Sequence, residues 1–217
     1  MEAKSMRFLF VSDLHNGEVF IKRLKEVAKE ADVVINCGDI CGAVRPFRTT
    51  HPLHLQAYIE ALEGFEHYFI LGNDDYVFET HPRRLTSLTR IGDIWIFPFE
   101  YVPITPFNTN REKSEEELRE MLSHANPPSP FIFVSHAPPF GILDVGGRSM
   151  KHLGSVAIRE FVFSRRPILH AFGHIHESPG CEIWDGIYFL NNSYGSAHLV
   201  EISEGRVKSV REVLLYN

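Results

Sequence analysis

The sequence predicts a single α/β domain that ends in antiparallel β-structure. Short apolar runs alternate with segments of helical periodicity between residues 7 and 174. From Glu182 onward, β-rich segments are separated by glycine turns. The 217 residues contain no internal repeat, low-complexity tract or linker. We therefore expect residues 1–217 to form one domain.

The expected strands and helices alternate along the chain. Short apolar runs predict strands at 7–13, 33–39, 67–73, 93–99, 131–136 and 168–174. Apolar residues at helical spacing predict helices at 17–32, 54–65, 111–125 and 155–166. The Glu-rich start of the third helix suits the positive end of the helix dipole, and Ser155 is the expected N-cap of the fourth. The tail predicts meandering antiparallel strands within 182–193, 197–203 and 206–216.

Composition and charge narrow the class of protein. A formal net charge of −6 argues against a general nucleic-acid binder. The three cysteines, Cys37, Cys41 and Cys181, cannot all pair, and the first two lack the second ligand pair of a zinc knuckle. The apolar run 8–11 is too short for a leader peptide or a membrane span. We expect a soluble cytoplasmic protein with free thiols and no membrane contact.

Five of the expected strands end in residue types that bind metal ions. The carboxyl ends of strands are where α/β folds build their sites. Side chains two residues apart on a strand point to the same side, and a preceding glycine lets the backbone turn tightly. The candidate ligands are Asp13, His15, Asp39, Asn73, His136, His174 and His176.

The mixture of donors indicates the kind of ion. Carboxylates, imidazoles and a carboxamide suit Mn, Fe, Co or Zn better than Ca, and no thiolate belongs to the set. Seven ligands are too many for one tetrahedral ion and suit two ions, with Asp39 between them. Two metals about 3.5–4 Å apart stabilise the attacking and leaving oxygens of a phosphoryl displacement.

The motif series "DLH", "GD", "GND", "SH" and "GHIH" resembles that of the calcineurin-like metallophosphoesterases. The segments "SHAPP" and "FGHIHES" resemble the small prokaryotic phosphohydrolases related to the Icc cyclic-nucleotide phosphodiesterase, and "NNSYGS" (191–196) resembles a turn near that family's C-terminus. The resemblance implies a four-layer α/β/β/α sandwich. It also implies hydrolysis of a small phosphoester by a metal-bridging hydroxide, as a phosphodiesterase or phosphatase.

By this resemblance, two divalent ions share Asp39. Manganese is the expected metal, and Fe, Co, Ni and Zn are the alternatives. The resemblance gives Asp13, His15 and His176 to one ion and Asn73, His136 and His174 to the other. Asn73 and His174 would also help to hold the transition-state oxygens.

Position 74 departs from the family pattern, which reads Gly-Asn-His followed by Asp or Glu. In the family the His assists the leaving oxygen and the next carboxylate orients it; here Asp74 replaces the His and Asp75 follows. Nearby cations should keep Asp74 ionised and unable to donate a proton. Loss of general acid catalysis costs about 10²–10⁴-fold, so esters with basic leaving groups should suffer most. Alternatively, Asp74 points into solvent, or His152 supplies the proton.

The sequence gives little information about the substrate. Arg45, Arg48, Arg148 and Lys151 are candidate phosphate contacts, although solvated surface charges are the simpler interpretation. The absence of a large insertion for a DNA-binding cap favours a small phosphoester as partner. Two alternatives stay open: a nuclease, and an interaction scaffold that keeps the fold, as in the phosphoesterase-like subunit of retromer. His170 is expected in the core or behind the ligands, and the remaining histidines carry no motif.

Overall fold

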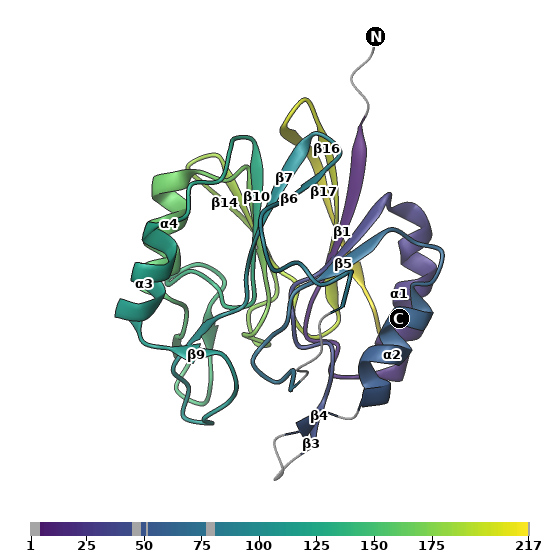
Figure 1. Ribbon diagram of the computed structural model, residues 1–217, viewed down its shortest axis with the longest axis horizontal. Helices are drawn as coiled ribbons and strands as arrows, with labels where there is room; N and C mark the ends of the chain where they lie inside the picture. The colour runs from purple at the N-terminus through teal and green to yellow at the C-terminus, as the bar shows by residue number, and fades with distance from the viewer. Residues whose placement is uncertain (1–4, 45–48, 51, 77–80, 217) are drawn as a thin grey trace.

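The computed structural model describes residues 5–44, 49–50, 52–76 and 81–216. Arg45 and Arg48, two of the candidate phosphate contacts, lie outside these residues. Two sheets stand face to face, with a pair of helices on the outer side of each (Figure 1). The arrangement is the four-layer α/β/β/α sandwich that the resemblance implied.

The first sheet carries the N-terminal part of the chain and its last two strands. Its order is β17 (Arg206–Leu214), β16 (Ser196–Ser203), β1 (Met6–Val11), β2 (Val33–Asn36) and β5 (His67–Phe69). Strands β1, β2 and β5 are parallel, and β16 runs antiparallel to β1. Helices α1 (Glu18–Val27), continued by a short 3₁₀ turn at Ala28–Glu30, and α2 (Pro52–Ala61) cover its outer face.

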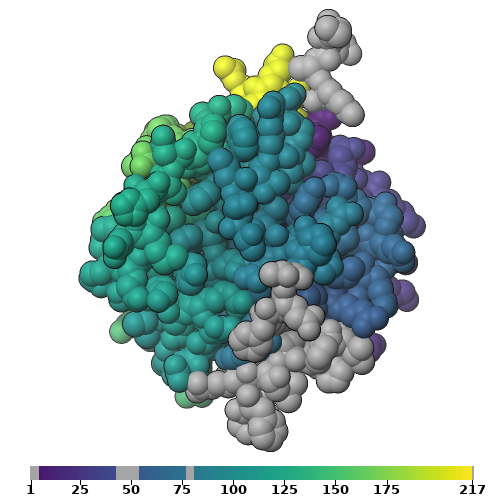
Figure 2. Space-filling view, viewed as in Figure 1, coloured from purple at the N-terminus to yellow at the C-terminus, as the bar shows by residue number. Residues whose placement is uncertain are grey.

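The second sheet carries the middle of the chain. Its order is β14 (Gly180–Trp184), β15 (Ile187–Asn191), β13 (Leu169–Phe172), β10 (Phe131–Ser135), β7 (Ile94–Phe99) and β6 (Thr89–Ile91). Strands β7, β10, β13 and β15 are parallel. Helices α3 (Glu115–Ser123) and α4 (Val156–Arg165) cover its outer face. In the space-filling view, the purple and blue N-terminal part and the teal and green middle part occupy opposite sides of one face (Figure 2).

The core has three apolar layers, and strand β1 shows why. Phe8 and Phe10 point between the two sheets, whereas Leu9 and Val11 point towards α1 and α2. Both faces of the strand are therefore buried, which accounts for its continuous apolar run in the sequence. A third layer, which includes Phe133, packs the second sheet against α3 and α4.

Short two-residue strands form three further pairs. Two of them belong to the loops that follow the strand ends: β8 (Val102–Pro103) with β9 (Glu112–Lys113), and β11 (Val145–Gly146) with β12 (Lys151–His152). The third pair joins β3 (Ala43–Val44) and β4 (Thr49–Thr50). None of the described helices is long and apolar enough to cross a membrane.

One expectation about elements was wrong, and another is confirmed in part. The helix expected at 111–125 begins at Glu115, because Ser114 and Glu117 form a reciprocal capping box and residues 112–113 pair with β8. The tail forms the expected antiparallel pairs, β14 with β15 and β16 with β17, but it is not one continuous meander, because the first pair joins the second sheet and the second pair joins the first. The N-cap expected at Ser155 is confirmed, because its side chain accepts a hydrogen bond from the Ile158 N–H.

Candidate metal centre

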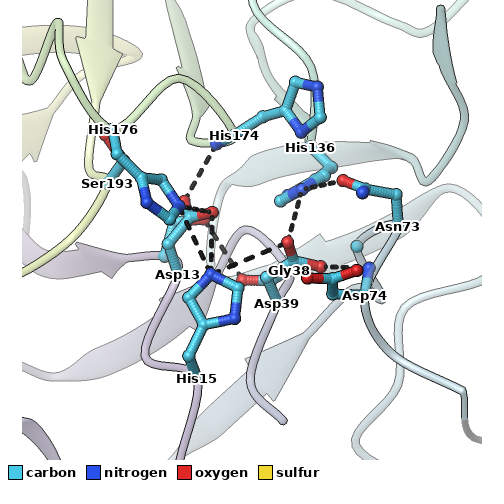
Figure 3. Close-up of polar contacts among 12 residues, drawn as sticks. Asp13, His15, Gly38, Asp39, Asn73, Asp74, His136, His174, His176 and Ser193 are labelled. Carbon is cyan, nitrogen blue, oxygen red and sulfur yellow. Dashed lines mark hydrogen bonds and ion pairs between the residues drawn. The ribbon is translucent and has the colours of Figure 1, made fainter. Parts of the chain in front are cut away.

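The predicted ligands lie where the parallel strands of both sheets end. Asp13 and His15 follow β1, and Asp39 and Asn73 follow β2 and β5 in the same sheet. His136 follows β10, and His174 and His176 follow β13 in the opposite sheet. The loops of the two sheets meet, so that these side chains face one another (Figure 3). The site therefore belongs to the seam between the sheets rather than to either sheet alone.

One group of donor atoms is formed by Asp13, His15 and His176. Their ligand atoms lie within 4.8 Å of one another. His176 Nε2 is 3.1 Å from Asp13 Oδ1 and 3.3 Å from His15 Nε2 (Figure 3). Ligands about 2.1 Å from one ion lie about 3.0–3.4 Å apart when they subtend right or tetrahedral angles. Two of the three pairs have this spacing, and the third, His15 Nε2 to Asp13 Oδ1, is 3.8 Å, so one cation could reach all three ligands.

A second group lies around Asp39 and His136, both of which are buried. His136 Nε2 is 3.3 Å from Asp39 Oδ2 and 3.0 Å from Asn73 Oδ1. Its Nδ1 faces the Cys37 carbonyl oxygen at 2.9 Å, and a carbonyl can only accept, so Nδ1 carries the proton. Nε2 is then the nitrogen that faces the site, and a bound cation would take the place of any proton there, as in a metal-binding histidine.

His174 lies at the edge of this second group. Its ring centroid is 5.0 Å from that of His136. Its backbone N–H donates to Asp13 Oδ2 at 2.9 Å, which places the residue against the first group as well. Among the described residues, however, the clusters of three ligand atoms within 4.8 Å do not include its imidazole.

Four of the predicted ligands have strained backbones. The φ angles are +53° at Asp13, +44° at His15, +52° at Asp39 and +72° at His174. Residues other than glycine seldom adopt positive φ, and such strain, about 1–3 kcal/mol each, gathers at functional sites. The loops after the strands are therefore shaped to aim these side chains at the expense of local stability.

Two glycines leave room for the carboxylates. A Cβ atom at Gly72 would lie 2.1 Å from Asp39 Oδ1, and one at Gly173 would lie 2.1 Å from Asp13 Oδ2. No side chain fits at such distances. Gly72 and Gly173, which precede Asn73 and His174, thus leave space for the two carboxylates. Asp39 packs against the backbone at Gly72, and Asp13 packs against the backbone at Gly173.

The protein groups alone already pair opposite charges in the centre. Burial works against ionisation of Asp13, but the hydrogen bond from His176 and the charge of His136 hold the pKa of Asp13 below its usual value. Burial opposes the charged form of His136, yet Asp39 and then Asp13 raise its pKa. Burial and the nearby His136 lower the pKa of His174 to about 4. The carboxylates are thus ionised and ready to bind a cation.

The turn of residues 72–75 is tied to the Asp39 loop. The backbone N–H of Asp74 donates to Asp39 Oδ1 at 2.8 Å. The buried Asp75 side chain accepts hydrogen bonds from the N–H groups of Gly72 at 2.9 Å and Cys41 at 2.8 Å. Burial and the neighbouring Asp39 raise the pKa of Asp75 to about 6. Asp75 therefore joins two ligand loops, a role different from the orientation of an imidazole that the family pattern suggested.

The loop before β9 orients Asn73, which the sequence did not reveal. Asn73 Nδ2 donates to Thr109 Oγ1 at 3.0 Å, and that hydroxyl donates to Glu112 Oε1. The amide is thereby fixed with Oδ1 towards His136. Arg111 holds the same turn, because its Nη1 donates to the carbonyl oxygens of Gly72 at 3.0 Å and Asp75 at 2.7 Å. The stretch 103–110 was expected only as a loop, and no periodicity marks its contacts.

The "NNS" turn anchors the loop that carries His174 and His176. Asn191 Nδ2 and Ser193 Oγ both donate to the Ile175 carbonyl, at 3.0 and 2.9 Å. Asn192 Nδ2 donates to the Phe172 carbonyl at 3.1 Å. The resemblance in residues 191–196 thus corresponds to a structural support of the ligand loop.

The structure also places the other residues that the sequence analysis singled out. His170 was expected in the core or behind the ligands; it is buried against Phe133, and its Nε2 lies 2.7 Å from Ser135 Oγ, beside the predicted ligand His136, so the core position is confirmed. His152 is half-exposed, and its Nδ1 lies 2.6 Å from the buried Asp144. Arg148 and Lys151 are exposed.

The fold and the clustered donors define a metallophosphoesterase-type domain. Residues 6–178 match the calcineurin-like phosphoesterase family, and the chain belongs to that family. An uncharacterized protein of Methanocaldococcus jannaschii, MJ1162, is 30% identical over 187 residues, which are 81% of this chain and 82% of that protein.

Solved structures share the fold at low sequence identity. TT1561 of Thermus thermophilus has a TM-score of 0.62 at 12% identity, over 98% of this chain and 100% of that chain. A dimetal phosphatase from Danio rerio has a TM-score of 0.58 at 11% identity, over 97% and 99%. At these identities the likeness concerns the fold.

Proposed function

We propose that this protein is a dinuclear-metal-dependent phosphoesterase that acts on a small phosphoester. The observation that carries the proposal is the meeting of donor atoms from five separate strand ends at ligand spacing. Membership of the calcineurin-like phosphoesterase family supports the reaction class. The donors fit two divalent ions of the Mn, Fe, Co, Ni or Zn type, because imidazole nitrogens and carboxylate oxygens are mixed and thiolates are absent.

The proposed ligands divide as the two groups of atoms do. Asp13, His15 and His176 would hold one ion, Asn73, His136 and His174 the other, and Asp39 would belong to both. When bound, two such ions supply an activated water at neutral pH and neutralise charge on the phosphoryl oxygens.

The remaining residues position this set. The Thr109 hydroxyl and Glu112 keep the oxygen of the Asn73 amide facing the site, and the Cys37 carbonyl keeps His136 Nε2 turned towards the site. With Asp74 at the position of the family His, the centre would lack an imidazole that could give a proton to a leaving group. We therefore propose that activated aryl esters are hydrolysed more readily than alkyl or nucleoside esters.

A scaffold without catalysis is the second candidate, and the convergence of the donor atoms argues against it. A scaffold has no need of donors that meet from five strand ends. The positive φ angles at Asp13, His15, Asp39 and His174 add to the argument, since each costs stability. A nuclease is disfavoured by the net charge of −6, because polynucleotide binding depends on basic surface.

The test is manganese-dependent hydrolysis of bis(p-nitrophenyl) phosphate. Asp39→Ala and His136→Ala should each lower kcat/KM by about a hundredfold or more, since metals supply several kcal/mol of transition-state stabilisation. Asp93→Ala is the matched control, because Asp93 is an exposed carboxylate on the β6–β7 turn. Turnover that persists in Asp39→Ala, or that does not depend on metal, would contradict the proposal.

A further inference from the structure

Residue 74 is held beside the metal centre by its own backbone. The Asp74 N–H donates to Asp39 Oδ1 at 2.8 Å. The turn around it is fixed at both ends, since Gly72 N–H donates to Asp75 and Arg111 donates to the carbonyls of Gly72 and Asp75. These contacts involve the backbone of residue 74 or its neighbours, so they fix the place from which its side chain starts.

The Asp74 carboxylate joins two predicted ligands. One ligand atom each from His15, Asp39 and Asp74 lie within 4.8 Å of one another. Within this group, His15 Nε2 is 3.9 Å from Asp39 Oδ2. Figure 3 shows Asp74 beside Asp39, and the side chain is half-buried. The alternative that Asp74 points away into solvent does not agree with this placement.

The donor atoms of His15, Asp39 and Asp74 lie close enough together for one cation to reach all three. A divalent ion bound to Asp13, His15 and His176 would share His15 with this group. It would also lie beside Asp39, whose Oδ2 is 3.9 Å from His15 Nε2. The Asp74 oxygen belongs to the same group of ligand atoms, so the ion would lie beside it as well.

We propose that Asp74 is a direct ligand of the ion held by Asp13, His15 and His176. The inference rests on the metal centre of the proposed function. A third carboxylate makes the donor set richer in oxygen, which favours harder ions such as Mn²⁺ over Zn²⁺. It also reduces the positive charge of the centre, which favours phosphodiesters, with one negative charge, over monoesters, with nearly two at neutral pH.

The experiment measures metal binding directly. Metal-free wild type, Asp74→Asn and Asp74→Ala are titrated with Mn²⁺ by isothermal titration calorimetry. Wild type should bind two ions per chain. Asp74→Ala should bind one of them at least about tenfold more weakly, as loss of a group that supports a metal typically costs 10–100-fold. Asp74→Asn keeps an oxygen that can bind, so its loss should be smaller. Asp93→Asn, which removes one exposed carboxylate, should bind as wild type does.

Two results would overturn the ligand assignment. One is wild-type affinity for both ions in Asp74→Ala, with circular dichroism showing a folded chain. The other is equal weakening in Asp74→Asn and Asp74→Ala, because a purely electrostatic role does not distinguish an amide from a methyl group. If Asp74→Ala does not fold, the Asn variant decides, since unchanged Mn²⁺ affinity there removes the case for an anionic ligand.

The titration separates this inference from the proposed function. Weakened Mn²⁺ binding in Asp74→Ala, together with no hydrolysis by the manganese-loaded wild type, leaves the ligand assignment standing and removes the enzyme. Hydrolysis by wild type, together with unchanged binding in Asp74→Ala, keeps the enzyme and removes the ligand.

Discussion

We predict that the buried His198 makes the free energy of unfolding decrease as the pH is lowered from 6.5. The side chain is 1% exposed on β16, and its Nδ1 lies 2.8 Å from Asn192 Oδ1. Because an amide oxygen only accepts, Nδ1 is the donor, and Nε2 is buried without a hydrogen-bond partner among the described residues. Burial lowers the pKa of His198 from 6.5 to about 4, although Glu212 opposes the shift.

The sign and size of the effect follow from linkage. Above pH 6.5 the imidazole is neutral in both the folded and the unfolded chain, so the free energy of unfolding does not change. As the pH falls from 6.5 towards 4, the unfolded chain takes up a proton that the folded chain refuses, and stability is lost. The loss from this single group is about 2 kcal/mol at pH 5 and about 3 kcal/mol at pH 4.

The perturbation is His198→Asn. An Asn Nδ2 can replace Nδ1 as donor to Asn192, so the hydrogen bond is kept while the titrating group is removed. Urea unfolding is measured between pH 7.5 and 5 in the presence of a chelator. The variant should be less stable than wild type at pH 7.5, because a smaller side chain leaves a cavity. Between pH 7.5 and 5 it should lose about 2 kcal/mol less than wild type does.

The control separates packing from titration. Val200→Ala makes a cavity on the same strand and removes no titrating group, so its curve of unfolding free energy against pH should run parallel to that of wild type. If His198→Asn is also parallel to wild type, the reasoning about the buried neutral imidazole is refuted.

Two further predictions concern the centre itself. Asp74→His restores the residue of the family pattern, so it should narrow the difference in kcat/KM between aryl and alkyl phosphodiesters. The difference is measured with a series of leaving groups. An unchanged ratio would contradict the role given to position 74. Thr109→Val removes the hydroxyl that fixes the Asn73 amide, so Mn²⁺ binding measured by calorimetry should weaken about 10–100-fold. Thr109→Ser keeps the hydroxyl and should bind Mn²⁺ as wild type does. Equal affinities in the two variants would show that the hydroxyl does not matter.

The strands and most helices could be predicted because their signals are local. Residues 8–11 of β1 are all apolar, since both faces of this part of the strand are buried in the sandwich. The start of α3 was misplaced, although Ser114 and Glu117 carry the spacing of a capping box. The predicted helix begins at residue 111 because the Glu-rich segment suits a first helical turn, whereas α3 begins at Glu115.

The pairing of the tail could not be read from its residues. Strands β15 and β16 have similar β-rich sequences, yet β15 pairs with β13 and β16 pairs with β1. Strand partners are chosen by contacts between distant parts of the chain, and these contacts leave no local pattern. The split places the Asn191–Ser193 turn between the sheets, where it supports the loop of His174 and His176.

The candidate ligands were visible because each follows a strand with a short motif. The residues that orient them were not visible, since Thr109 and Arg111 lie in a loop without periodicity and act on residues more than thirty positions earlier. Such supports depend on the fold bringing loops together. A single sequence shows which residues could bind a metal far better than it shows which residues aim them.

The turn of residues 72–75 explains how position 74 can change its chemistry. Asp75 accepts backbone hydrogen bonds from Gly72, Ile40 and Cys41 and is fully buried, so it joins the Asn73 loop to the Asp39 loop. Residue 74 contributes its backbone N–H to this junction, through the bond to Asp39, and any residue other than proline can do so. A His and an Asp at position 74 therefore present different groups to the same centre from the same backbone. The geometry of the turn depends on Asp75, whereas the side chain of residue 74 can change without altering these backbone contacts.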